Sequence, residues 1–162
     1  MQAEKKVEWC LRKAEKEGKR HKGLLKVEPS QTKVTEHLTK ARRNLALVDH
    51  LVEIGYSDWA VSAIFYSMYH SLLAVLWKYG YESRNQACTF AVMKQLIVDK
   101  KLVVTIDELQ RIQESSSGLD ETVVDLREYY QYGTETEIEK EKLVWLQQQA
   151  KEFAWKVSVM LV

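Results

Sequence analysis

The residues with the clearest chemical potential lie in two stretches of different character. His70 stands inside a run from Trp59 to Trp77 that has no Asp, Glu, Lys or Arg. Arg127 follows Leu126 and precedes Glu128 and two tyrosines. An imidazole can move a proton near neutral pH, and a guanidinium can hold a phosphate through two hydrogen bonds. The two side chains together point to phosphate binding or to phosphate-ester chemistry.

We expect His70, Arg127 and Tyr132 to come together in space. The polar side chains of the uncharged run need partners inside the protein, and an apolar neighbour favours burying the stem of Arg127. A guanidinium close by would keep the imidazole neutral. The candidate ligand-binding residues are Arg127, Tyr132, Tyr66, His70, Arg84 and Asn85, and the only catalytic candidates are His70 and Arg127.

Structural alternatives exist for both central residues. A histidine in an apolar helix is often a hydrogen-bonded core residue. Arg127 has four acidic neighbours with which it could form an ion pair, namely Asp120, Glu121, Asp125 and Glu128.

Familiar motifs for cofactors and metals are missing from the chain. It has neither GxGxxG nor GKS/GKT, and no HExxH. No Asp or Glu stands three residues before any histidine, which excludes the paired Glu-x-x-His of ferritin-like di-iron bundles. His50 and Glu53 share a helix face, but two groups do not make a metal site. We therefore expect no metal and no cofactor.

Composition predicts one all-α domain. The chain has 162 residues with only one Pro and six Gly, too few for the turns of a sandwich or barrel. Cys10 and Cys88 lie far apart without a CxxC motif, so we expect no disulfide scaffold and a cytoplasmic location.

Charge is distributed unevenly along the chain. Residues 1–45 carry 13 Lys and Arg against 6 Asp and Glu, whereas residues 46–162 carry 11 against 17. A basic head on an acidic body indicates nucleic-acid contact or association of head with body, and a solvated helix of mixed charge explains the same numbers. Glu8 and Arg12 form a favourable i,i+4 pair for such a helix.

Apolar periodicity predicts an up-and-down helical bundle of about five helices plus an N-terminal helix. Helices are expected at 3–20, 32–54, 58–79, 85–100, from 105, at 120–131, and from 136 to the C-terminus. Gly55 and Gly80 end two of them, and Ser57 or Asp58 caps the one at 58–79. Capping boxes are expected at Thr105–Glu108 and Thr136–Glu139, and a break at Ser115–Gly118. No strand is predicted.

The uncharged run is long enough to span a bilayer. Its polar residues, among them Ser67 and His70, would then face lipid at a cost, so the central helix of a soluble core is the favoured interpretation. We expect no membrane contact.

Two segments resemble the HEPN-domain family. GYSDWAVSAIFYSMYHSLLAVLW, residues 55–77, is similar to its signature helix, and the matching positions are Gly55, Tyr56, Ala60, Phe65, Tyr66, Met68, Tyr69 and His70. DLREYYQYG, residues 125–133, is similar to the Leu-Arg-x-x-x-Asp-Tyr run of one subgroup. There Leu126, Arg127 and Tyr132 match, and Gln131 replaces the Asp.

The resemblance, over residues 36–160, implies a homodimeric bundle that binds or cleaves RNA or binds nucleotides. It also implies a small nucleotidyltransferase as partner in a toxin–antitoxin pair. The ribonuclease branch places a His four to six residues beyond the Arg, and no His follows Arg127 here. A neutral phenol such as Tyr132 is a poor general base. We therefore expect a non-catalytic binding protein; the alternative is a ribonuclease or other phosphate-ester enzyme using Arg127 and His70.

The expected organisation is a basic N-terminal helix and linker at 1–30, dispensable for folding, and a HEPN-like bundle at 31–162. Trp145, Gln148, Glu152 and Trp155 share one face of the last helix, away from its core stripe. Two tryptophans on a semi-polar face suit a homodimer interface.

Overall fold

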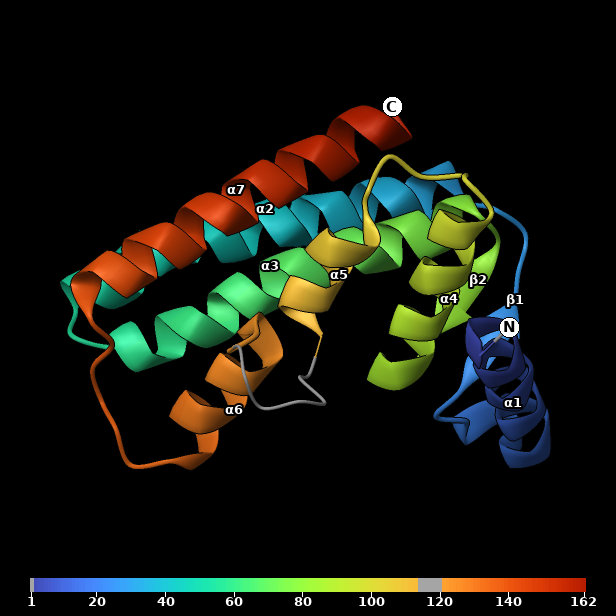
Figure 1. Ribbon diagram of the computed structural model, residues 1–162, viewed down its shortest axis with the longest axis horizontal. Helices are drawn as coiled ribbons and strands as arrows, with labels where there is room; N and C mark the ends of the chain where they lie inside the picture. The colour runs from blue at the N-terminus through green and yellow to red at the C-terminus, as the bar shows by residue number, and fades with distance from the viewer. Residues whose placement is uncertain (1, 114–120) are drawn as a thin grey trace.

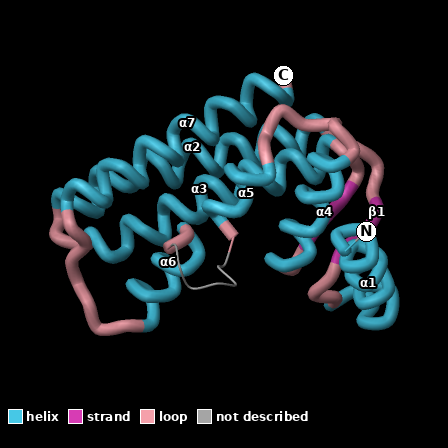
Figure 2. Tube along the Cα trace, viewed as in Figure 1, coloured by secondary structure: helices cyan, strands magenta, loops and turns pink. Residues whose placement is uncertain are grey.

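The computed structural model describes residues 2–113 and 121–162, and it is an all-α bundle as predicted (Figure 1). Two short strands form the only sheet of the described residues (Figure 2). The helices are α1 (Gln2–Glu17), α2 (Gln31–Glu53), α3 (Ser57–Lys78), α4 (Gln86–Val98), α5 (Ile106–Ile112), α6 (Val123–Tyr132) and α7 (Lys140–Leu161), with a 3-10 turn η1 (Gly18–Arg20) and strands β1 (Leu24–Lys26) and β2 (Tyr81–Ser83).

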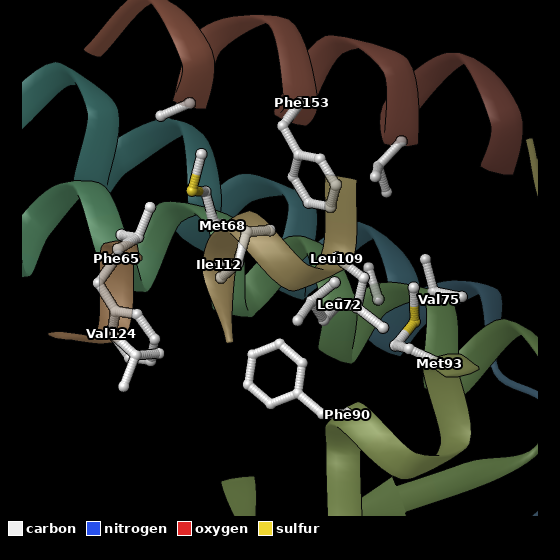
Figure 3. Close-up of a cluster of buried hydrophobic side chains, with 14 of the residues drawn as sticks. Phe65, Met68, Leu72, Val75, Phe90, Met93, Leu109, Ile112, Val124 and Phe153 are labelled. Atoms are coloured by element: carbon white, nitrogen blue, oxygen red, sulfur yellow. The ribbon is translucent and has the colours of Figure 1, made fainter. Parts of the chain in front are cut away.

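The apolar helix α3 is the centre of the bundle. It packs against α2, α7, α6 and α4, and Figure 1 shows α2, α3 and α7 running along the long axis of the molecule. Its most apolar window is 72% buried inside the protein, although the helix is long and apolar enough to cross a membrane. Figure 3 shows Phe65, Met68 and Leu72 of α3 among the side chains from α4, α5, α6 and α7 that form the core. Burial by other helices therefore accounts for the absence of charge.

Local sequence signals set most helix ends. Gly55 and Gly80 follow α2 and α3 at φ values of +83° each, a conformation that favours glycine. Thr105 and Glu108 form the predicted capping box of α5. The box predicted at Thr136–Glu139 is wrong, because α7 begins at Lys140 without a side-chain cap.

The starts of α3 and α6 also differ from the expected capping. α3 begins at Ser57 itself, whose hydroxyl accepts a hydrogen bond from the backbone N–H of Ile138 at 3.2 Å. A capping box that was not predicted, Thr122 with Asp125, opens α6. The predicted break at Ser115–Gly118 and the acidic neighbour Asp120 lie outside the described residues.

The expectation of no strand is wrong. β1 pairs antiparallel with β2, with Leu24 opposite Ser83 and Lys26 opposite Tyr81. Both strands have three residues, too few to show an alternating pattern, and their pairing joins segments nearly 60 positions apart in the chain. The pairing gives the segment between α1 and α2 a fixed place against the bundle.

The expectation that Cys10 and Cys88 build no disulfide scaffold is also wrong. Cys10 of α1 and Cys88 of α4 form a disulfide across 78 positions of sequence, with their Cα atoms 5.9 Å apart. α1 packs along α4, so residues that are distant in sequence meet in the fold. The disulfide removes the argument by which unpaired cysteines indicated a cytoplasmic location.

The N-terminal segment shares the core of the bundle. Val7, Cys10 and Leu24 belong to the same buried cluster as α3, and Gly23 lies so close to Cys10 and Ala14 of α1 that a Cβ would clash with their backbone. Arg84 adds a hydrogen bond from Nη1 to the backbone oxygen of Lys19 at 2.9 Å. The domain boundary at residue 30 remains a prediction. That residues 1–30 can be removed without loss of the fold also remains a prediction, and a truncated protein must fold without the contacts just described to confirm it.

Candidate functional site

His70 faces α2 and pairs there with His37. The two Nδ1 atoms are 3.0 Å apart, and the rings stack with centroids 5.3 Å apart and an angle of 26° between their planes. A hydrogen bond at this distance needs one ring to donate and the other to accept, so at least one imidazole must be neutral. His37 is therefore the hydrogen-bond partner of His70 Nδ1, which the sequence could not identify.

Both histidines resist protonation. Burial, the neighbouring His37 and the charge of Lys40 together lower the pKa of His70 to about 4. Burial is also the main cause that lowers the pKa of His37, with Lys33 and Lys40 acting in the same direction and Glu36 against them. Neutral rings at physiological pH are weak proton donors, and the basicity of His70 is reduced.

Arg127 lies on α6 against the side of α3. Its Cζ is 4.4 Å from the centroid of the Phe65 ring, and only 11% of its side chain is exposed. Nη1 donates to Oε1 of Gln131 at 3.2 Å, and Nη2 is 3.8 Å from Oε1 of Glu128. Nε is buried and has no hydrogen-bond partner in the described part of the chain. The ion-pair alternative thus holds in a loose form with Glu128, and part of the donor capacity of the guanidinium is unused.

The predicted meeting of His70, Arg127 and Tyr132 does not occur. His70 is paired with His37, Arg127 rests on Phe65, and Tyr132 is 76% exposed at the end of α6. Five helical residues separate Arg127 from Tyr132, which turns them by about 140° relative to each other. The Tyr66 ring meets the Phe65 ring edge-on at a centroid distance of 5.1 Å, so Tyr66 and Arg127 share Phe65 as a neighbour.

Arg84 and Asn85 have structural roles in the fold. Arg84 bonds to Glu82 and to the backbone of Lys19, so it ties β2 to the N-terminal segment. Asn85 is the N-cap of α4, where its Oδ1 accepts from the backbone N–H of Cys88 at 3.0 Å. No hydrogen bond or ion pair joins either residue to Arg127. Their proposed roles in ligand binding remain predictions.

His37 is the residue that sequence reasoning missed. It stands next to Leu38 and three positions after Val34, both buried on the core stripe of α2. A polar residue at the edge of such a stripe borders the neighbouring helix, and that position was the available signal.

A cavity of about 700 Å³ lies between α5, α7 and the start of α6. It is lined by Trp145, Gln148, Glu152 and Trp155, the face of α7 that the sequence singled out. Trp145 and Trp155 are 57% and 70% exposed. The semi-polar face of α7 therefore borders a cavity, and both of its tryptophans are largely exposed.

The family of the chain follows from a comparison of sequences. The model of the HEPN domain matches residues 34–154, which are 121 of the 162 residues. The chain belongs to the HEPN-domain family. Domains of this family are helical and often bind RNA or resemble ribonucleases. No curated protein matches the chain.

The match clarifies what belongs to the HEPN domain and what does not. It begins within the first turn of α2 and ends within α7, so it includes both His70 and Arg127. It leaves out α1 and β1, the basic segment that the disulfide joins to α4.

Proposed function

We propose that this HEPN-domain protein binds the phosphate groups of RNA or of a nucleotide at Arg127 without cleaving them. The observation that carries the proposal is the incomplete set of partners around the guanidinium. One firm hydrogen bond, to Gln131, and one loose ion pair, to Glu128, leave it with donors to spare, and the ring of Phe65 fixes its orientation. An oriented guanidinium is suited to a phosphate because its donors match two phosphate oxygens.

The surroundings of Arg127 argue against proton transfer. No histidine follows it in the chain, and the two histidines of α2 and α3 are engaged with each other. His70 has a lowered pKa of about 4, which makes it a weak general base. We expect phosphate to be held at this site without an imidazole to take a proton from a nucleophile.

The test is binding of a fluorescent uridine mononucleotide, together with a gel assay for cleavage of a labelled oligouridine. We expect Arg127→Gln to weaken mononucleotide binding at least tenfold and Arg127→Lys to weaken it less, since lysine keeps the charge but not the fork. Arg42→Gln, at an exposed position on α2, is the matched control. Equal affinity of the Arg127→Gln variant would exclude the site. Cleavage that disappears in both Arg127→Gln and His70→Gln would favour the enzyme alternative.

We also propose that the protein is a homodimer. The exposed Trp145 and Trp155 support this, because tryptophans on an uncovered face are common interface anchors. Sedimentation at tens of micromolar is expected to show a dimer, and Trp155→Glu is expected to shift it toward monomer. A monomeric wild-type protein at that concentration would contradict the proposal. A nucleotidyltransferase partner and a cytoplasmic location remain predictions.

A further inference from the structure

The cations of α1 gather on one side of the helix. Lys5, Lys6, Arg12, Lys13 and Lys16 follow three- and four-residue spacing around Trp9, and we call these six residues the basic stripe. At 100° per residue they fall within an arc of about 120° centred near Trp9. Glu4, Glu8 and Glu15 lie together on a different side. The positive and negative charges of α1 therefore lie on different sides of the helix, although they alternate along the sequence.

The fold holds the basic stripe toward solvent. Val7, Cys10 and Ala14 are buried on the opposite side of α1, which packs along α4. The disulfide from Cys10 to Cys88 fixes that side covalently. In Figure 1, α1 lies at the edge of the molecule, at the end away from α6. The stripe and Arg127 are consequently two separate surfaces.

The cations of the stripe are only weakly neutralised. Lys5 and Lys16 have no ion pair with any described residue, and Arg12 has only Glu8, at 3.9 Å. Lys13 is paired with Glu17. Lys6 places Nζ 3.9 Å from the centroid of Trp9, and the Trp9 ring is itself 45% exposed. Free cations around an accessible indole are a combination that suits phosphates and bases at once.

We propose that the basic stripe of α1 is a contact surface for single-stranded RNA. Lysine and arginine would neutralise successive phosphates, and a base would stack on Trp9, as in sequence-tolerant single-strand binding. Lys5 and Lys16 are about 17 Å apart along the helix axis, long enough to follow several nucleotides. The choice of RNA rests on the proposed function, whereas the surface itself lies outside the residues matched by the HEPN model.

An anionic membrane fits this surface less well. A helix that lies in a membrane interface inserts its apolar side among the lipids. Here that side is occupied, because Val7, Cys10 and Ala14 pack against the bundle. Among the described residues of α1, Trp9 is the one large apolar side chain exposed enough to insert, so a strand of nucleic acid is the better match for the stripe.

The experiment measures fluorescence anisotropy of a labelled 16-nucleotide oligouridine at several salt concentrations. The test variants are the triple change Lys5→Gln, Arg12→Gln, Lys16→Gln, and the single change Trp9→Ala. The control removes three exposed lysines elsewhere, by Lys78→Gln, Lys100→Gln and Lys101→Gln. All of the changed side chains lie outside the core, and circular dichroism melts will verify that each variant folds.

We expect the triple stripe variant to bind at least tenfold more weakly, with a salt slope smaller by about 2, which is the contribution of three cations on a single strand. Trp9→Ala is expected to weaken binding about tenfold with an unchanged salt slope, because stacking carries no charge. The lysine control should stay close to wild type. Equal losses in the control and the stripe variant would overturn the inference.

The outcomes separate this inference from the proposed function. Mononucleotide binding that depends on Arg127, with no effect of the stripe variants on oligouridine, would leave the function standing and refute the stripe. Oligouridine binding that depends on the stripe, without any effect of Arg127→Gln on either ligand, would do the reverse. Stripe-dependent sedimentation with phosphatidylserine vesicles, without oligouridine binding, would identify a membrane surface and overturn the choice of RNA.

Discussion

The molecule uses a cation beside an aromatic ring in two contrasting places. At one end, Arg127 rests 4.4 Å from the centroid of Phe65 with 11% of its side chain exposed. At the other, Lys6 lies 3.9 Å from the centroid of Trp9, which is 45% exposed. Such contacts are worth about 0.5–1 kcal/mol in water and about 2 kcal/mol when desolvated. The buried contact therefore fixes the orientation of Arg127, whereas a ligand can replace Lys6 on the exposed ring of Trp9.

Lys6 and Trp9 are held in place by the disulfide that joins α1 to α4. We expect removal of this disulfide to have the largest effect on stability. Replacing both cysteines, by Cys10→Ser with Cys88→Ser, is expected to lower the free energy of unfolding by about 4 kcal/mol, because a long loop is no longer closed in the unfolded chain. Urea unfolding measures it. Dithiothreitol should destabilise the wild type and leave the double variant unchanged. Wild-type midpoints that agree with and without the reductant would show that the cross-link contributes no stability.

Matched substitutions test the comparison directly. Arg127→Met and Lys6→Met both remove a charge and keep an apolar stem. We expect Arg127→Met to lower the free energy of unfolding by about 1–2 kcal/mol and Lys6→Met by less than about 0.5 kcal/mol. Thermal or urea unfolding of the two variants under one set of conditions gives the difference. Equal losses would mean that burial does not distinguish the two contacts.

We expect the smallest effect from the histidine pair, because both rings are partly exposed and solvent screens their charges. The folded-state pKa of His70, about 4, lies below its ordinary value of 6.5, so the unfolded chain takes up the proton first. Stability is therefore expected to be full above pH 6.5 and to fall as the pH drops from 6.5 toward 4. His37 acts in the same direction, and Lys40 is the charged group that bears on both rings.

Melting temperatures across this pH range measure the effect in the wild type and in His70→Gln. The variant is expected to lose part of the slope, whereas His50→Gln, at an exposed position, is expected to keep it. An unchanged slope in His70→Gln would assign the acid sensitivity to carboxylates elsewhere.

Sequence reasoning succeeded where signals were local. The stripe from Val34 to Val48 and the glycines at 55 and 80 located α2 and α3 to within a few residues. The Thr105 capping box worked because its two partners are three positions apart and need nothing else from the fold. The similar pattern at Thr136 failed, since the chain there continues as a loop to Glu139.

The candidate site was less predictable because its contacts join distant segments. His70 was recognised as needing a partner, but the choice between Arg127 and His37 depends on which helix lies beside each face of α3. The pairing of Cys10 with Cys88 likewise depends on the packing of α1 along α4. The side chain of Arg127 lies against the bundle with its head near Gln131 and Glu128, as expected, whereas its unpartnered Nε was not foreseen.

The cross-link between α1 and α4 also determines how the chain responds to mechanical force. Residues 10 to 88 form a covalent ring that contains α2 and α3. A pull on the two termini passes through the sulfur atoms and cannot extend what lies between them. Optical tweezers should find the fully stretched chain shorter by about 260 Å than after reduction, at about 3.4 Å for each of the 78 bypassed positions. Force applied across the chain therefore extends residues 10 to 88 only after the disulfide is reduced.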